Sequence, residues 1–128
     1  MNSEVPGIFK KLDGWASHSY PTGFTGQPWA TGRATIKGYL WELDTLRNLG
    51  SVNDLKIFIT ETGWLNQLNT NYIKDAFENI WLPDNKIMAV TPFILNYPYY
   101  PFAGFSWLDE QGNPYPQFDL IKSLNKIK

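Results

Sequence analysis

The chain has 128 residues, of which 43% are hydrophobic, 16% aromatic and 18% charged, with a formal net charge of −1. This composition predicts one globular domain over residues 1–128, and it argues against the basic stripe that binds nucleic acid or an anionic membrane. The absence of cysteine excludes disulfides and thiolate metal sites. No apolar run approaches the roughly 20 residues that span a bilayer, and residues 1–7 lack the pattern of a signal peptide.

The first half of the chain predicts a strand, a loop and a helix. Residues 15–21 form a short aromatic and apolar segment closed by proline, and residues 22–31 have the Gly, Pro and Thr content of a loop. Over residues 35–49 apolar side chains recur at steps of three and four, which predicts a helix, and Gly50 follows where a left-handed cap residue belongs. The predicted buried face of this helix consists of Ile36, Leu40, Leu43, Leu46 and Leu49.

The next elements are a strand and a helix. Residues 56–61 are a nearly continuous apolar run that ends in a glutamate, as expected of a buried strand. Thr70 or Asn71 is the predicted cap of a second helix, and Pro83 ends it. Its apolar face is predicted to contain Ile73, Ala76, Phe77 and Ile80.

The last third of the chain predicts a strand, a long loop and a helix. Residues 87–95 have the composition of a third buried strand, although Pro92 cannot donate a hydrogen bond to a neighbouring strand. Residues 96–116 form a loop rich in tyrosine, phenylalanine and tryptophan, with a tight turn at residues 109–113. A final helix from about Gln117 aligns Phe118, Ile121 and Leu124.

The order strand, helix, repeated three times, predicts an α/β fold with a parallel sheet. Polar and aromatic residues follow each predicted strand: His18 and Tyr20, then Glu61 and Trp64, then Asn96 with the aromatic loop. In a (β/α)₈ barrel the carboxyl ends of the strands carry the active site. We therefore expect these residues to lie together at one end of the sheet.

Glu61 carries the strongest chemical signal. A carboxylate at the end of a buried strand costs free energy unless it is hydrogen-bonded or used. Gly63 permits a sharp turn after it, and Trp64 offers a flat aromatic face. A carboxylate beside an aromatic platform suits the binding or cleavage of a sugar, and Trp107 and residues 97–100 add further aromatic faces.

Three segments together resemble a known family. Residues 13–21, which contain His-Ser-Tyr, residues 58–64, which contain Thr-Glu-Thr-Gly-Trp, and residues 90–107 look like strands six, seven and eight of the clan A retaining glycoside hydrolases. The resemblance implies a glycosidase in which Glu61 is the catalytic nucleophile. It also implies that His18, Tyr20 and Trp107 bind the carbohydrate substrate, and that no metal or cofactor takes part. Trp64 and Asn96 are further predicted substrate-binding residues, because they follow the predicted strands.

The chain also departs from that family. Such a barrel has eight strands and about 250 residues, whereas this chain has room for about three βα units. The family's acid/base glutamate follows an asparagine on strand four, and no matching Asn-Glu step is present. The resemblance therefore implies the C-terminal part of a partial TIM barrel, inactive alone, which self-associates or pairs with a complementary half. An extracellular or cell-envelope location is what the family implies.

Two alternatives remain open from the residues. One is a non-catalytic carbohydrate-binding or scaffold half-barrel, in which Glu61 accepts hydrogen bonds from sugar hydroxyls. The other is an unrelated α/β domain with a ligand at the strand ends. A nucleotide-binding version of it would need a Gly-rich phosphate loop, and Gly23, Gly26 and Gly32 do not have that spacing.

Overall fold

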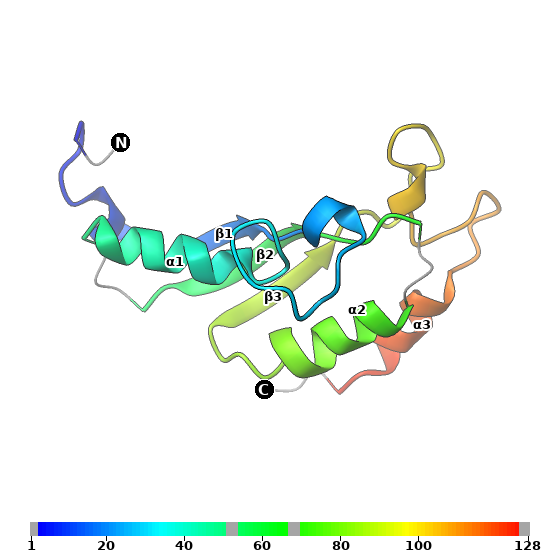
Figure 1. The fold of residues 1–128 in the computed structure, drawn as a ribbon. Helices are drawn as coiled ribbons and strands as arrows, with labels where there is room; N and C mark the ends of the chain where they lie inside the picture. Colours follow the sequence, from blue (N-terminus) through cyan, green and yellow to red (C-terminus); the bar gives the residue numbers. More distant parts are fainter. Residues whose placement is uncertain (1–2, 51–53, 67–69, 126–128) are drawn as a thin grey trace.

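The computed structural model describes residues 3–50, 54–66 and 70–125. Strands and helices alternate along these residues (Figure 1). The strands are β1 (Gly14–His18), β2 (Lys56–Thr62) and β3 (Ile87–Pro92), and the α-helices are α1 (Gly38–Asn48), α2 (Thr70–Ala76) and α3 (Pro116–Ser123). Shorter helical segments are η1 (Ile8–Lys11), η2 (Thr22–Phe24), η3 (Phe77–Trp81), which continues α2 as a π-helix, and η4 (Ala103–Phe105).

The three strands form one parallel sheet in the order β1-β2-β3. This arrangement confirms the predicted α/β class, with adjacent parallel strands in sequential order. Parallel neighbours place their carboxyl ends at the same edge of a sheet. The segments after the three strands, including the loop around η4, accordingly lie beyond the arrowheads in Figure 1.

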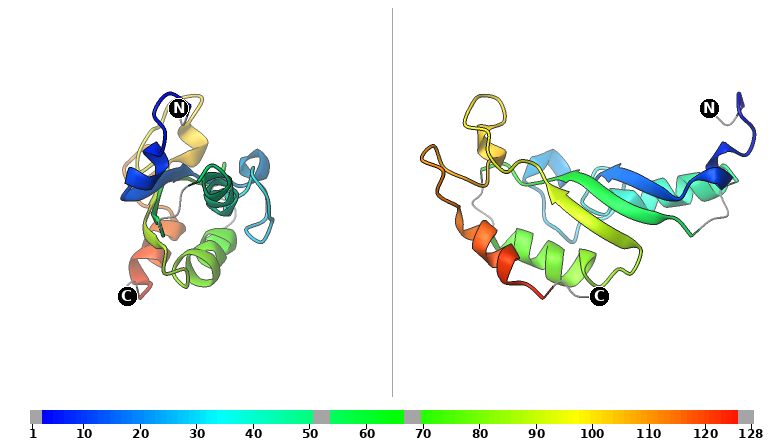
Figure 2. Two further views of the ribbon diagram at one scale, coloured as in Figure 1. Left: turned by 90° about the vertical axis from the view of Figure 1, so that its left-hand side faces the viewer. Right: turned by 180° about the vertical axis from the view of Figure 1, so that it is seen from behind.

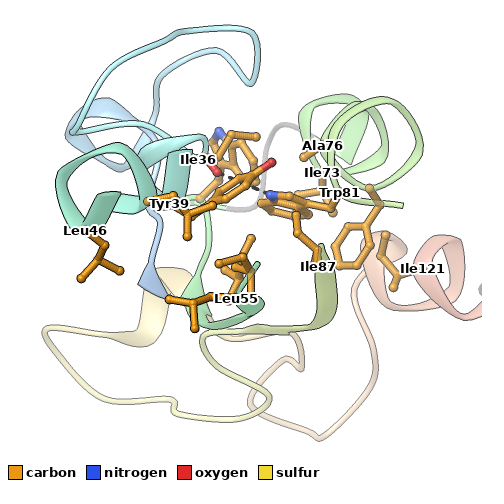
Figure 3. Packing of buried hydrophobic residues seen from close by; sticks show 14 residues of the cluster. Ile36, Tyr39, Leu46, Leu55, Ile73, Ala76, Trp81, Ile87 and Ile121 are labelled. Atoms are coloured by element: carbon orange, nitrogen blue, oxygen red, sulfur yellow. Dashed lines mark hydrogen bonds between the residues drawn. The ribbon is translucent and has the colours of Figure 1, made fainter. Parts of the chain in front are cut away.

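Helices cover one face of the sheet. Ile57 and Ile59 of β2 are fully buried, whereas Phe58 and Thr60, which alternate with them, are exposed. Figure 2 shows α1 and α2 on the same side of the strands, and α3 lies next to α2 (Figure 1). The core between sheet and helices is drawn in Figure 3. It includes Ile36 from the turn before α1, and its helical members include Tyr39, Leu43, Leu46, Ile73, Ala76, Phe77, Trp81 and Ile121.

The first helix differs from its prediction in start and in buried face. It begins at Gly38, and a Cβ at this position would lie 2.6 Å from the Arg33 carbonyl oxygen, so only glycine fits there. Tyr39 is buried, whereas Leu40 is 43% exposed and Leu49 is 47% exposed, so the predicted buried face was wrong at these two leucines. The Tyr39 hydroxyl, which donates to Asp84 at 2.9 Å, allows this polar aromatic residue to occupy the core.

Other element boundaries follow local chemistry. β3 ends at Pro92, three residues before the predicted end, since proline cannot donate to a ladder. α3 starts at Pro116, whose fixed φ suits the first turn of a helix. The predicted cap Gly50 has a φ of 90°, a positive value as expected of a left-handed cap residue. The turn at residues 109–113 is confirmed, with Asp109 Oδ1 accepting from the backbone of Gln111 and Asn113.

Candidate functional site

A bulge in β2 sets the direction of Glu61. Strict alternation would place Glu61 on the buried face with Ile57 and Ile59. The register instead pairs Ser17 with Ile59 and His18 with Glu61, so Thr60 is an extra residue. As a result Thr62 is buried and the Glu61 side chain is 39% exposed, opposite His18.

Thr91 of β3 stabilises this bulge. Its hydroxyl lies 2.7 Å from the Thr60 carbonyl oxygen and 3.2 Å from that of Ile59. A bulge leaves backbone groups without their regular ladder partners. The neighbouring strand therefore supplies a side-chain donor at the point where the ladder is interrupted.

Glu61, Tyr20 and His18 form a compact polar cluster at the carboxyl end of the sheet. The Tyr20 hydroxyl donates to Glu61 Oε2 at 3.2 Å, and His18 Nδ1 lies 3.5 Å from the same oxygen. Burial, and then the charge and the accepted hydrogen bond of Glu61, raise the pKa of Tyr20 well above its usual value. Tyr20 therefore stays protonated and serves as a donor. The structure brings together these three residues, as the sequence predicted.

A network of hydroxyl groups holds the two strand ends beneath this cluster. The Ser19 N–H donates to the Glu61 carbonyl at 3.0 Å, and the Thr62 hydroxyl donates to the Ser19 carbonyl at 2.6 Å. Ser19 Oγ lies 2.8 Å from Ser17 Oγ and accepts from the Tyr39 N–H at 3.2 Å. Ser17, Ser19, Tyr39 and Thr62 are buried, and this network was not predicted from the sequence. Their signal is the run of hydroxyl residues at the ends of otherwise apolar strands.

Two aromatic rings that no local sequence pattern indicates pack against Tyr20. The Tyr20 ring lies 5.2 Å from that of Phe24 and 6.1 Å from that of Phe105, both edge to face. Gly63 permits this packing, because a Cβ there would lie 2.7 Å from the Phe93 carbonyl oxygen and 3.3 Å from the Phe105 ring. The close approach of residues 93 and 105 to β2 therefore depends on glycine at position 63.

Trp64 lies in the hydrophobic core and not at the rim. It is 5% exposed, and its indole nitrogen donates to the Gly26 carbonyl at 2.8 Å. Its ring lies 6.5 Å from that of Trp81 in the core. The flat face that we expected to stack on a sugar is covered by protein. The physical reason is the large apolar area of the indole, which is stabilised most by burial.

The two predicted site residues after β3 lie in the loop that follows this strand and beside α3. Asn96 is exposed in the loop that follows β3. Trp107 packs against the core and lines a hollow of about 440 Å³ between β3 and α3. Its backbone N–H donates to the carbonyls of Ile94 and Leu95. The structure therefore assigns Trp107 to the packing of the α3 side.

The cluster contains one carboxylate. Residues 14–32 and 91–108, which contain the segments following β1 and β3, have no Asp or Glu. In the parts of the chain that the structure describes, no group of three or more His, Cys, Asp or Glu side chains is placed to hold a metal ion. The described helices also include none that is long and apolar enough to cross a membrane.

Comparisons with known proteins returned no match to a family model, a curated protein or a solved structure. The function is therefore inferred from the geometry of the cluster. A partly exposed carboxylate that accepts a phenolic hydrogen bond and lies beside an imidazole has two chemical uses. It is suited to nucleophilic attack, or to accepting hydrogen bonds from a polyhydroxylated ligand.

Proposed function

We propose that this chain provides the nucleophile side of a retaining glycosidase site, with Glu61 as the nucleophile. The observation that carries the proposal is the position of Glu61 Oε2, held by Tyr20 at 3.2 Å and faced by His18 at 3.5 Å. The cluster lies at the carboxyl ends of parallel strands, where (β/α)₈ enzymes hold their catalytic residues. The resemblance to strands six to eight of clan A glycoside hydrolases supports the same roles and a partial TIM-barrel fold.

In this proposal each residue of the cluster has a defined task. A retaining enzyme holds two carboxyl groups about 5–5.5 Å apart, one of which attacks the anomeric carbon while the other protonates the leaving oxygen. Glu61 attacks, Tyr20 donates to the carboxylate and orients it, and His18 binds substrate hydroxyls. The acid/base carboxyl group has to come from outside residues 14–32 and 91–108. We therefore expect no turnover of ordinary glycosides by the chain alone.

A second candidate is a carbohydrate-binding or scaffold half-barrel without catalysis. The single carboxylate of the cluster favours it, because Glu61 and Tyr20 would then act only as hydrogen-bond partners of sugar hydroxyls.

The two candidates differ in covalent chemistry. We expect a 2-deoxy-2-fluoro glycoside with a dinitrophenolate leaving group to react with Glu61, because this leaving group departs without a general acid. The carboxylate forms an ester to the anomeric carbon, dinitrophenolate leaves, and the ester accumulates because no base activates water. Intact-mass spectrometry should show one added glycosyl unit, mapped to the peptide that contains Glu61.

Matched variants decide the outcome. Glu61→Gln should abolish labelling, whereas Glu78→Gln, which changes an exposed carboxylate on η3, should leave it unchanged. Labelling that persists in Glu61→Gln would remove Glu61 from the mechanism. Sugar binding without labelling, in a protein whose near-ultraviolet circular dichroism shows fixed aromatic packing, would favour the binding module.

A further inference from the structure

A continuous series of aromatic ring contacts starts at the polar cluster. Tyr20, which donates to Glu61, contacts Phe24 and Phe105, and these two rings lie 5.3 Å apart. Phe105 contacts Phe93 at a centroid distance of 5.9 Å. All these contacts are edge to face, a geometry that stabilises aromatic pairs beyond their buried area. The rings nearest Glu61 are therefore fixed by one another.

The series continues outward through the loop after β3. The Phe93 ring lies 5.5 Å from that of Phe102, Phe102 lies 5.9 Å from Tyr97, and Tyr97 lies 5.7 Å from Tyr99. This loop, around η4, stands beyond the carboxyl ends of the strands in Figure 1. We call the series the aromatic ridge, which consists of Tyr20, Phe24, Phe93, Tyr97, Tyr99, Phe102 and Phe105.

The ridge is buried at its base and exposed along its outer side. Phe105 is 7% exposed, whereas Phe24 and Phe102 are each 44% exposed and Tyr99 is 68% exposed. Tyr100, next to the ridge, is 94% exposed. Exposed aromatic groups gathered on one surface mark a binding site more often than isolated ones do. The buried rings supply rigidity, and the exposed rings supply faces for a ligand.

The charge of the surrounding segments limits the ligand. Neither residues 14–32 nor residues 91–108 contain an Asp, Glu, Lys or Arg, although 18% of the chain is charged. Phosphate groups and nucleic acids require cationic side chains, also where bases stack on aromatic rings. An acidic or basic peptide would require opposite charges. A neutral ligand with apolar faces and many hydroxyl groups matches aromatic rings and tyrosine hydroxyls.

We propose that the aromatic ridge binds a neutral oligosaccharide of several sugar units, one end of which reaches the Glu61 cluster. The proposal rests on the proposed function for the chemistry at Glu61, and it adds the substrate class: an uncharged glycan chain longer than one or two sugars. Tyr99 of the ridge, and Tyr100 next to it, contact the units farthest from Glu61. Their contribution therefore grows with ligand length.

Binding measured against ligand length tests the ridge. Isothermal titration calorimetry with the full chain would use neutral oligosaccharides, from monosaccharide to hexasaccharide, derived from cellulose, xylan, mannan and galactan. We expect at least one series to bind more tightly as it lengthens. Tyr99→Ala and Tyr100→Ala should each weaken hexasaccharide binding about 2- to 10-fold and leave monosaccharide binding unchanged. Both side chains are highly exposed, so neither change disturbs the core.

Tyr115→Ala is the matched control. Tyr115 is 37% exposed at the start of α3, outside the ridge, and its replacement should change no affinity. Affinity independent of length, or an equal loss in the Tyr115 variant, would overturn the proposal. Binding restricted to acidic oligogalacturonate, to basic chitosan oligomers or to a protein partner would also overturn it.

The glycosidase proposal and the ridge proposal fail in different ways. Length-dependent binding that is lost in the tyrosine variants, without labelling at Glu61, supports the ridge and contradicts the catalytic role. Labelling at Glu61 without any dependence on ligand length supports the catalytic role and overturns the ridge.

Discussion

Glu61 is positioned by one extra residue in β2. Its partner Tyr20 approaches from the segment after β1, and the bulge at Thr60 turns the carboxylate towards it. The hydrogen bond of 3.2 Å couples a neutral phenol to a group that carries negative charge when ionised. Such coupling should be visible in the titration of Tyr20.

We expect Glu61→Gln to lower the pKa of the Tyr20 phenol. The carboxylate of Glu61 disfavours the phenolate by its charge and by the hydrogen bond it accepts. Burial, the largest cause of the shift, remains in the variant, so the pKa should stay above the ordinary value of about 10. Alkaline titration of ¹³C-labelled tyrosine by NMR, with Tyr20 assigned through Tyr20→Phe, measures the change.

The control for this titration is Glu110→Gln, which removes an exposed charge in the turn after η4. An unchanged Tyr20 pKa in Glu61→Gln would contradict the coupling.

The raised pKa of Tyr20 also has a consequence for the stability of the folded protein. The folded state binds this proton more tightly than the unfolded state, so the contribution of Tyr20 is complete below about pH 10 and is lost as the pH rises above it.

The ends of β1 and β2 are joined by side-chain hydroxyl groups as well as by the ladder. Two hydrogen bonds link them: the Ser19 N–H donates to the Glu61 carbonyl, and the Thr62 hydroxyl donates to the Ser19 carbonyl. Thr62 is 1% exposed, so water does not replace its hydroxyl when it is removed. This pair fixes the relative positions of the two segments that carry Tyr20 and Glu61.

Thr62→Val should destabilise the protein by about 1–3 kcal/mol, because the Ser19 carbonyl loses a buried donor. Thr45→Val removes a hydroxyl that donates to the Trp41 carbonyl on the surface of α1, and it should cost less than about 0.5 kcal/mol. Urea unfolding measures both, with the stability change read from the midpoint at a constant m value. Equal effects of the two substitutions would show that Thr62 has no special role.

Among the residues that the structure describes, helices cover one face of the sheet and leave the other face uncovered. The accessible surface is 7982 Å², whereas a compact monomer of this mass exposes about 6,900 Å². Parallel sheets are normally covered on both faces, and unpaired edge strands favour association. Phe58, which alternates with the buried Ile57 and Ile59, is 41% exposed and shows apolar area on the sheet that a partner would cover.

We expect the chain to self-associate through this face. Sedimentation velocity should show species larger than the 14.7 kDa monomer. Phe58→Asp should shift the distribution to monomer, because it places a charge in the centre of the uncovered face. Leu40→Asp, which alters a residue 43% exposed on α1, should not. A wild-type protein that sediments as a single monomeric species would contradict this prediction and would direct attention to a complementary polypeptide as the partner.

Local sequence patterns predicted the order of the strands and helices and the residue types at their ends. Local periodicity located the three strands and helices within a few residues, because side-chain spacing of two or about 3.6 is a property of the segment alone. The turn at residues 109–113 and the cap at Gly50 were also predictable, because turn and cap residues are likewise properties of a short segment. So was the meeting of His18, Tyr20 and Glu61, because neighbouring parallel strands place their carboxyl ends together.

The direction in which particular side chains point depends on tertiary contacts. The burial of Trp64 depends on Trp81 and on the Gly26 carbonyl, and the exposure of Glu61 depends on a bulge supported by Thr91. The contacts that build the aromatic ridge join residues 20 and 24 to residues 93–105. Such contacts join segments far apart in the chain, so no local pattern encodes them; they form because packing and hydrogen bonding select one arrangement of the assembled elements.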